Sequence, residues 1–156
     1  MPDHDHTRQW EGLNELGTEL MRSGDYAEAA EKILAAVDIK EDEWGSWLNL
    51  GLCFFHLQDF ENAVVAFQNA TTLNPRSAQA WNNLGTVLGI LDDWKGAASA
   101  FDAGIGADPA YAKNYLGRGN AYVMAGDRQR ARSYFQQAIA ADPGYIKARE
   151  ALSQLD

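Results

Sequence analysis

The feature that most constrains the fold of this chain is a residue pattern that recurs every 34 positions. The clearest copy consists of Trp81, Leu84, Gly85, Leu88, Ala97, Phe101 and Pro109. The same template starts again at Trp47 and at Tyr115, and a blurred copy starts at Leu13, with Glu41 in place of the proline. A fixed period of this length is typical of repeat arrays, in which each repeat packs only on its neighbours.

Each copy predicts two helices joined by a short turn. The large residues Trp81, Leu84 and Leu88 follow one another at spacings of three and four, which puts them on one helical face. We expect Gly85 to let two helices approach closely and Phe101 to fill the wedge between repeats. Pro109 is expected at the start of the next helix, where its missing N–H costs nothing.

The spacing Trp-x2-Leu-Gly-x2-(aromatic or Leu), followed by Ala-x3-Phe and then Pro, resembles the tetratricopeptide (TPR) family. Where that family favours Tyr, the copies here carry Leu20, Phe54, Leu88 and Tyr122. The resemblance implies an all-α fold, a right-handed α-solenoid of helix-turn-helix repeats. We expect a tail over 1–9 with Thr7 as an N-cap, and a single domain over 10–156. Its repeats are 10–43, 44–77, 78–111 and 112–145, followed by a capping helix over 146–156 with Ile146, Leu152 and Leu155 facing inward.

Composition agrees with a soluble repeat protein. Apolar residues make up 46% of the chain and charged residues 22%, and the apolar runs are far shorter than the ~20 residues of a membrane span. The acidic start lacks the apolar stretch of a secretory signal, so we expect a cytoplasmic protein. The single cysteine, Cys53, lies among apolar residues and is expected to be buried.

The first residues allow two interpretations. If the initiator methionine is removed, the new N-terminus Pro2-Asp3-His4 places a histidine third, an arrangement that can chelate Cu(II) or Ni(II) through nitrogen ligands. The alternative is a solvated acidic tail.

TPR-like arrays line a concave groove with their first helices, and by register this predicts a peptide-binding surface. The predicted groove residues are Leu48, Asn49, Leu52, Phe55, Asn82, Asn83, Thr86, Gly89, Ile90, Lys113, Leu116 and Asn120. One side of this set is apolar and the other is rich in amides, which suit a peptide backbone because they both donate and accept hydrogen bonds. Gly89 stands where a larger residue is expected, so it either leaves a dent beside Phe55 and Ile90 or is simply tolerated.

The best-known TPR site, a clamp for acidic C-terminal tails, is not predicted here. Only Asn83 and Lys113 match that pattern, and the remaining places hold Leu48, Leu52 and Gly117. A dicarboxylate needs cations to offset its desolvation. The predicted ligand is therefore a neutral or partly apolar peptide or helix.

Charge is unevenly distributed along the chain, whose net charge is −9. The repeat at 10–43 carries ten acidic and three basic residues, whereas 112–145 carries two acidic and five basic ones, including Arg118, Arg128, Arg130 and Arg132. This gradient allows a salt-sensitive head-to-tail homo-oligomer, or two independently solvated ends. The overall negative charge argues against nucleic acid.

The sequence predicts no enzyme. Three histidines, one cysteine and no glycine-rich phosphate loop provide no nucleophile with a base in register, and no cofactor or metal site is expected in the repeats. We therefore predict a protein-interaction module or adaptor. The alternatives are a self-assembling scaffold that uses its charged ends and a small secretion-type chaperone.

Overall fold

The computed structural model describes residues 3–155, with side chains from residue 5 onward, and within that range the secondary structure is entirely α-helical. Its backbone contacts divide the chain into two compact units, Met1–Asn74 and Pro75–Asp156. The boundary between these units falls between the second and third repeats, and the single domain over 10–156 that the sequence predicts stays a prediction. Each unit is therefore described separately.

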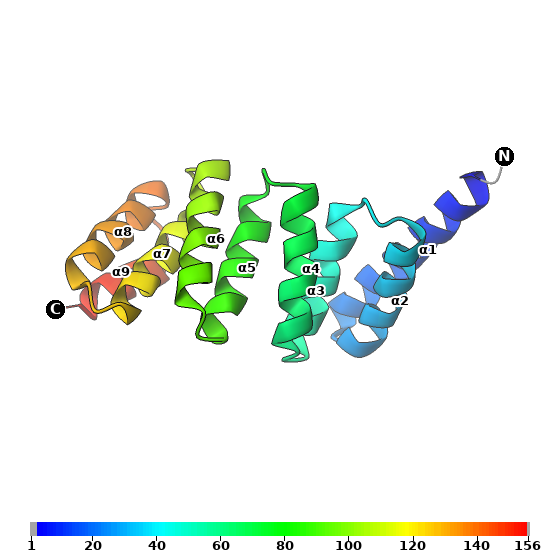
Figure 1. The fold of residues 1–156 in the computed structure, drawn as a ribbon, viewed down its shortest axis with the longest axis horizontal. Coiled ribbons are helices and arrows are strands. Elements are labelled where there is room, and N and C mark those ends of the chain that lie inside the picture. The colour runs from blue at the N-terminus through cyan, green and yellow to red at the C-terminus, as the bar shows by residue number, and fades with distance from the viewer. Residues whose placement is uncertain (1–2, 156) are drawn as a thin grey trace. The chain divides into compact units, whose positions relative to one another are not determined.

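The N-terminal unit contains two helix pairs, coloured blue to green in Figure 1. Its helices are α1 (Asp3–Ser23), α2 (Tyr26–Ile39), α3 (Trp44–His56) and α4 (Phe60–Leu73). Each pair packs together, and α2 also packs on α3. The helix α1 begins at Asp3, before the first repeat, where the sequence predicts a tail. Thr7 therefore lies inside α1 and does not cap it.

The C-terminal unit repeats the arrangement and adds a last short helix (Figure 1). Its helices are α5 (Ala78–Ile90), α6 (Trp94–Ala107), α7 (Ala112–Met124), α8 (Arg128–Ala141) and α9 (Ile146–Ser153). The first helices of its two repeats, α5 and α7, contact each other directly, and α9 packs on α8 and α7. Helix-turn-helix repeats thus form both units, as the 34-residue period predicts.

The turn inside every repeat has the same construction. One residue takes a left-handed backbone, with φ between 60° and 87°, and the next is an aspartate at the N-cap of the second helix. The left-handed residues are Gly24, Gln58, Asp92 and Gly126. In the third repeat the N–H groups of Asp92 and Asp93 donate to the carbonyl oxygens of Gly89 and Leu88 at 3.1 and 2.9 Å, which satisfies the last carbonyls of α5.

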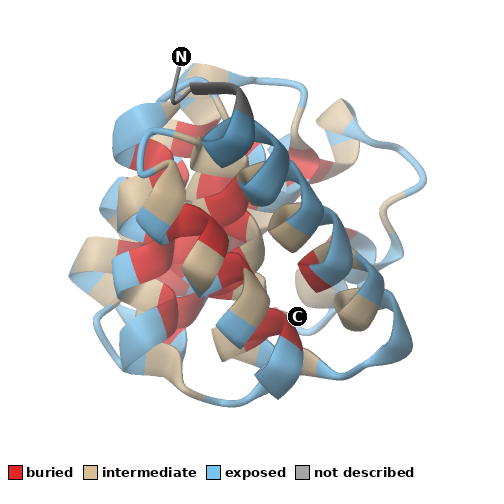
Figure 2. Cartoon of the chain, turned by 90° about the vertical axis from the view of Figure 1, so that its right-hand side faces the viewer, coloured by how far each residue is buried: buried red, intermediate tan, exposed pale blue. Residues whose placement is uncertain are grey.

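The core of the N-terminal unit lies where α2 packs between α1 and α3. Ala29, Ile33, Leu50 and Cys53 are at most 1% exposed in this cluster, which confirms the prediction that Cys53 is buried. Figure 2 shows the buried residues on the helix faces that pack together and the exposed ones on turns and outward faces. Burial raises the pKa of the Cys53 thiol from 9.0 to about 11, because an apolar setting disfavours the thiolate.

The core of the C-terminal unit contains the predicted wedge. A Cβ built on Gly85 would lie 2.7 Å from Cε1 of Phe101, and one built on Gly117 would also collide with that ring. The ring is therefore held between a glycine of α5 and a glycine of α7, and it is 3% exposed. Beside it the buried Asn114 donates from Nδ2 to the carbonyl oxygen of Ala78 at 3.1 Å, which ties α7 to the start of α5.

The repeated prolines act differently from the prediction. Pro109 lies between the end of α6 at Ala107 and the start of α7 at Ala112, so it is in the connecting turn and not at the first helical position. The turn before each first helix also supplies a hydrogen-bond acceptor for the repeated tryptophan. Nε1 of Trp81 donates to the carbonyl oxygen of Pro75 at 2.9 Å. Nε1 of Trp47 makes the equivalent bond, at 2.8 Å, to Glu41, which stands in the place of the proline.

The last helix caps the C-terminal unit with two of the three residues predicted to face inward. Leu155 is buried and Leu152 packs on the Ala131–Phe135 cluster, as predicted, whereas Ile146 is 66% exposed and Ala148 is buried in its stead. Ala148, Leu152 and Leu155 follow at spacings of four and three, and Ile146 lies two positions before Ala148, on the opposite side of the helix.

Candidate interaction surfaces

In the N-terminal unit the predicted groove residues lie on α3. Asn49, Leu52 and Phe55 are half-buried, but Leu48 is only 7% exposed and belongs to the interior. The Phe55 ring packs edge-on against His56 and Phe60, with centroids 5.8 and 5.9 Å apart. The accessible part of this surface is therefore aromatic and apolar, with one amide beside it.

His56 lies at the end of this surface and stacks on an aromatic ring. Its imidazole lies parallel to the Tyr26 ring at the start of α2, with centroids 4.1 Å apart and an angle of 8° between the planes. The Tyr26 ring thus covers one face of the imidazole.

In the C-terminal unit the predicted residues lie on the two contacting helices α5 and α7. Thr86, Ile90, Lys113 and Asn120 are exposed, and the remaining predicted side chains, Asn82, Asn83 and Leu116, are half-buried. The Thr86 hydroxyl donates to the carbonyl oxygen of Asn82 at 2.8 Å, so its own helix already uses that donor. Leu116 also packs on the Ala131–Phe135 cluster and is thus partly a core residue.

Gly89 does not leave the dent that its small size predicts. A Cβ built on Gly89 would lie 3.0 and 3.2 Å from Cζ3 and Cη2 of Trp94, and Gly89 itself is buried. The indole of Trp94, at the first position of α6, occupies the space in question. Gly89 is therefore a packing residue, and the prediction of a pocket there is wrong.

Exposed apolar side chains mark the C-terminal ends of α5 and α7. Ile90 is 46% exposed, and Val123 and Met124 are 41% and 57% exposed. Ile90 and Met124 occupy equivalent positions in consecutive repeats. Large apolar residues exposed together are unusual on a surface that meets only water, and we call Ile90, Val123 and Met124 together with Asn82, Thr86, Leu116 and Asn120 the α5–α7 face.

The basic residues of the fourth repeat do not form one free edge. Arg118 occupies the place of the motif leucine, and its Nε donates to Oδ1 of Asp102 at 2.8 Å while the guanidinium lies 4.3 Å from the centroid of the Tyr122 ring. Tyr122 stacks on Tyr134 at 5.5 Å. Burial, and secondly the charge of Asp102, raise the pKa of Tyr134. Arg118 is thus a packing residue, and the exposed cations of α8 begin at Arg128.

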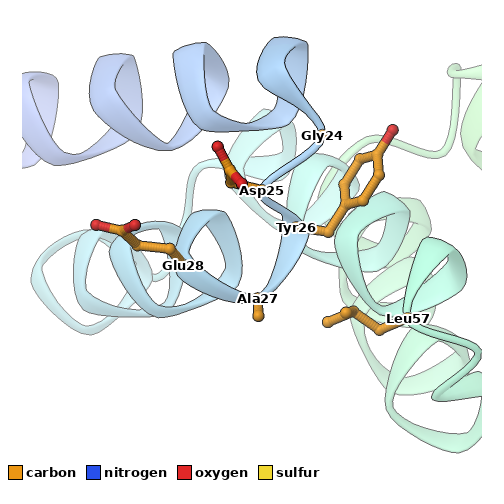
Figure 3. A pocket seen from close by; sticks show the side chains of 6 residues that line it. All are labelled: Gly24, Asp25, Tyr26, Ala27, Glu28 and Leu57. Atoms are coloured by element: carbon orange, nitrogen blue, oxygen red, sulfur yellow. The ribbon is translucent and has the colours of Figure 1, made fainter.

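A cavity of about 350 Å³ lies at the turn between α1 and α2, where the sequence predicts no site. Its lining residues are Gly24, Asp25, Tyr26, Ala27, Glu28 and Leu57 (Figure 3). The carboxylates of Asp25 and Glu28 extend from one side of the start of α2 in that view, and Tyr26 and Leu57 lie on the other. Leu57 is 44% exposed, so the cavity combines acidic groups with an apolar wall.

Two further predictions concern metals and membranes. The proposed copper or nickel ligands Pro2, Asp3 and His4 lie outside the residues whose side chains the structure describes. In the remainder of the chain no group of three or more His, Cys, Asp or Glu side chains is arranged to hold a metal ion. No described helix combines the length and the apolar character needed to cross a membrane.

The architecture defines a class of protein. Helix-turn-helix units of 34 residues, glycines against a wedge phenylalanine and a final polar helix are the attributes of TPR proteins, which generally serve as interaction scaffolds without catalysis of their own. The family described as the cilia and flagella-associated protein 70 C-terminal domain matches residues 8–155, and the chain belongs to this family.

Solved structures with the same fold include TPR proteins of several kinds. A MamA protein superposes with a TM-score of 0.88 at 20% identity, covering 96% of this chain and 81% of that one. MamA from Desulfovibrio magneticus RS-1 gives 0.85 at 23% identity, covering 94% and 83%. YrrB, a TPR protein with an unusual peptide-binding site, gives 0.80 at 23% identity, covering 88% and 71%. At these identities the likeness concerns the fold, and it confirms the predicted fold class. No curated protein matches the sequence.

Proposed function

We propose that this protein is a protein-interaction module whose α5–α7 face binds a neutral or partly apolar peptide or helix of another protein. The observation that carries the proposal is the exposure of Ile90, Val123 and Met124 on two contacting helices, next to the amides of Asn82 and Asn120. Apolar anchors supply affinity in such sites, and amides fix the register of a bound backbone.

The charge of this face sets the class of ligand. None of the residues that define the α5–α7 face is charged, and Lys113, outside that face, is the one cation among the predicted groove residues of the C-terminal unit. A single lysine does not offset the desolvation of a dicarboxylate tail, so the ligand is expected to be apolar and uncharged at the contact. In the N-terminal unit, Asn49, Leu52 and Phe55 of α3 form a surface of similar composition that we propose for the same kind of ligand.

The relatives support a binding role in general terms. YrrB is described as having a peptide-binding site, and a further structure with the same fold, Cut9, is described in a hetero-tetramer with Hcn1. A peptide and the protein Hcn1 both belong to the class of ligand proposed here, namely another protein or a segment of one.

A peptide library selected on the intact chain tests the proposal. We expect the selected peptides to be apolar with little charge, and their affinity, measured by fluorescence anisotropy, to fall at least about fivefold in Ile90→Ala and in Asn120→Ala, roughly 1 kcal/mol. The matched control is Gln136→Ala on α8, an exposed residue outside both surfaces. If the selected peptides are acidic, or if Gln136→Ala weakens binding as much, the proposed face is wrong.

A further inference from the structure

The aspartates that cap the second helices are equivalent by sequence but not in structure. Asp59, Asp93 and Asp127 each accept a hydrogen bond from the backbone N–H three residues later, at 3.3, 2.9 and 3.0 Å. Asp25, at the same place in the first repeat, makes no such cap bond, and its carboxylate pairs with no cation of the described residues. Its oxygens are therefore available to a ligand, although a side-chain cap typically stabilises a helix by about 1 kcal/mol.

The cavity beside Asp25 favours one kind of side chain. Glu28 adds a second exposed carboxylate, which makes no ion pair within the part of the chain that the structure describes, and Tyr26 and Leu57 supply an apolar wall (Figure 3). An arginine fits this combination, because its planar guanidinium binds carboxylates and its aliphatic stem packs on apolar surface. With about 350 Å³, the cavity is at the low end of the roughly 300–1,000 Å³ typical of ligand sites, so it suits a single side chain.

The chain itself carries such an arginine at the start of α8. Arg128 is exposed, and its guanidinium makes no ion pair or hydrogen bond with the described residues, whereas Arg130 pairs with Asp127 at 3.4 Å. At this register position the other three repeats have Tyr26, Phe60 and Trp94. Asp127, at the N-cap of α8, is the acidic residue next to Arg128 in the sequence, but its carboxylate accepts the Arg130 N–H and pairs with the Arg130 side chain. The Arg128 guanidinium is thus available to an anionic partner.

The charges of the two units favour contact between copies. Residues 1–74 carry fourteen acidic and four basic side chains, a net charge of −10, and residues 75–156 carry eight and nine, a net charge of +1. The N-terminal unit of one copy therefore attracts the basic start of α8 of another far more than it attracts a second N-terminal unit. This complementarity identifies a second copy of the chain as the occupant.

We propose that the protein associates head to tail, with Arg128 of one copy seated in the cavity at the start of α2 of the next, between the carboxylates of Asp25 and Glu28 and against Tyr26 and Leu57. The two surfaces of this contact are different, so each copy still has one of each surface free after pairing. Such a heterologous contact adds further copies unless its rotation closes a ring. It uses neither α5 nor α7, so it is separate from the proposed peptide site.

The test is the molar mass of the full chain, measured by sedimentation and light scattering over a wide range of concentration at low and high salt. We expect the mass to grow with concentration at low salt and to fall to that of the monomer at high salt, because the contact is an exposed ion pair. Asp25→Arg and Arg128→Asp should each weaken association about tenfold or more, since each places like charges together.

Charge exchange distinguishes the contact from a general effect of net charge. The double variant Asp25→Arg/Arg128→Asp should associate again, because the two charges of the contact are exchanged. An equimolar mixture of the two single variants should also associate, because each cavity can then pair with a residue of opposite charge at position 128 of the other variant. Glu31→Arg, an exposed residue of α2 outside the cavity, is the control for charge and should associate as the wild type does. Circular dichroism and thermal unfolding establish that every variant is folded.

Three results overturn the proposal. The first is that the protein stays monomeric at every protein and salt concentration. If the cavity of such a monomer binds an arginine-containing peptide, the occupant is a basic partner other than a second copy, and the proposal is still wrong. The second is association that Asp25→Arg and Arg128→Asp leave unchanged. The third is failure of the folded double variant to associate although both single variants are defective.

Discussion

Alanine in place of Gly85 should destabilise the C-terminal unit although it improves the helix. In an exposed helix, replacing glycine with alanine stabilises by about 0.8–1.0 kcal/mol. At Gly85 the new Cβ would lie 2.7, 2.9 and 2.9 Å from Cε1, Cδ1 and Cζ of Phe101, whereas ordinary contacts are 3.4–4 Å. A shift of the ring towards α7 is blocked, because Gly117 already leaves no room for a Cβ beside the same ring atoms.

The magnitude follows from these two opposing effects. Overpacking a well-filled core costs about 1–3 kcal/mol, and subtracting the gain in helix propensity of about 0.8–1.0 kcal/mol leaves a loss of roughly 0–2 kcal/mol. For a chain of this length, the upper end of that range corresponds to a fall in Tm of about 4–8 °C. The measurement is urea unfolding followed by circular dichroism, with the thermal midpoint as a second observable.

Gly106 is the control for this prediction. It lies near the end of α6 in the same unit, and a Cβ built there has no neighbour within 4 Å, so Gly106→Ala should stabilise by up to about 1 kcal/mol. Phe101→Leu removes the ring, and the double variant Gly85→Ala/Phe101→Leu should be less destabilised than the sum of its single changes. If Gly85→Ala and Gly106→Ala both stabilise, the close fit of Phe101 does not control this core.

Three further expectations follow from the other packing features. Asp93→Ala should cost about 1 kcal/mol more of unfolding free energy than Asp25→Ala, because Asp93 accepts the cap hydrogen bond from the Gly96 N–H and Asp25 accepts none; equal losses in urea titrations would contradict this. Asn114→Ala should destabilise by about 1–3 kcal/mol, since it leaves the Ala78 carbonyl without its buried donor; a neutral effect would mean that water replaces the amide. Cys53 should react with a thiol reagent slowly at neutral pH and faster only as pH rises towards about 11, because burial disfavours the thiolate; denaturant should restore ordinary reactivity, and a fast reaction of the folded protein would refute the assigned burial.

The sequence predicts the repeat packing well because packing is periodic. Phe101 and Gly85 recur with their equivalents every 34 residues, and a position that recurs with the same size has the same neighbours in every repeat. The buried state of Cys53 follows in the same way from Val87 and Ala121, its equivalents in the third and fourth repeats, whereas the first repeat has Glu19 at this position. The paired helices follow from the three- and four-residue spacings within each repeat, and the fold class is what the resemblance to the TPR family implies.

The residues that the sequence misjudged are those whose neighbours differ between repeats. The small size of Gly89 suggests an empty space, but Trp94 fills it. The residue at the position of Trp94 differs from one repeat to the next. Arg118 was grouped with a basic edge, but Asp102 and Tyr122 engage it. The free carboxylate of Asp25 has no sequence signal at all, because the same aspartate caps its helix in three other repeats.

The division of the chain into two units bears on its motions. The cluster around Ile33 and Leu50 and the cluster around Phe135 each consist entirely of residues from one unit. Opening of one cluster therefore need not open the other, and backbone amides of the two units are free to exchange with solvent deuterium at separate rates. A perturbation such as Gly85→Ala should then speed exchange in α5–α8 while α2 and α3 keep their protection.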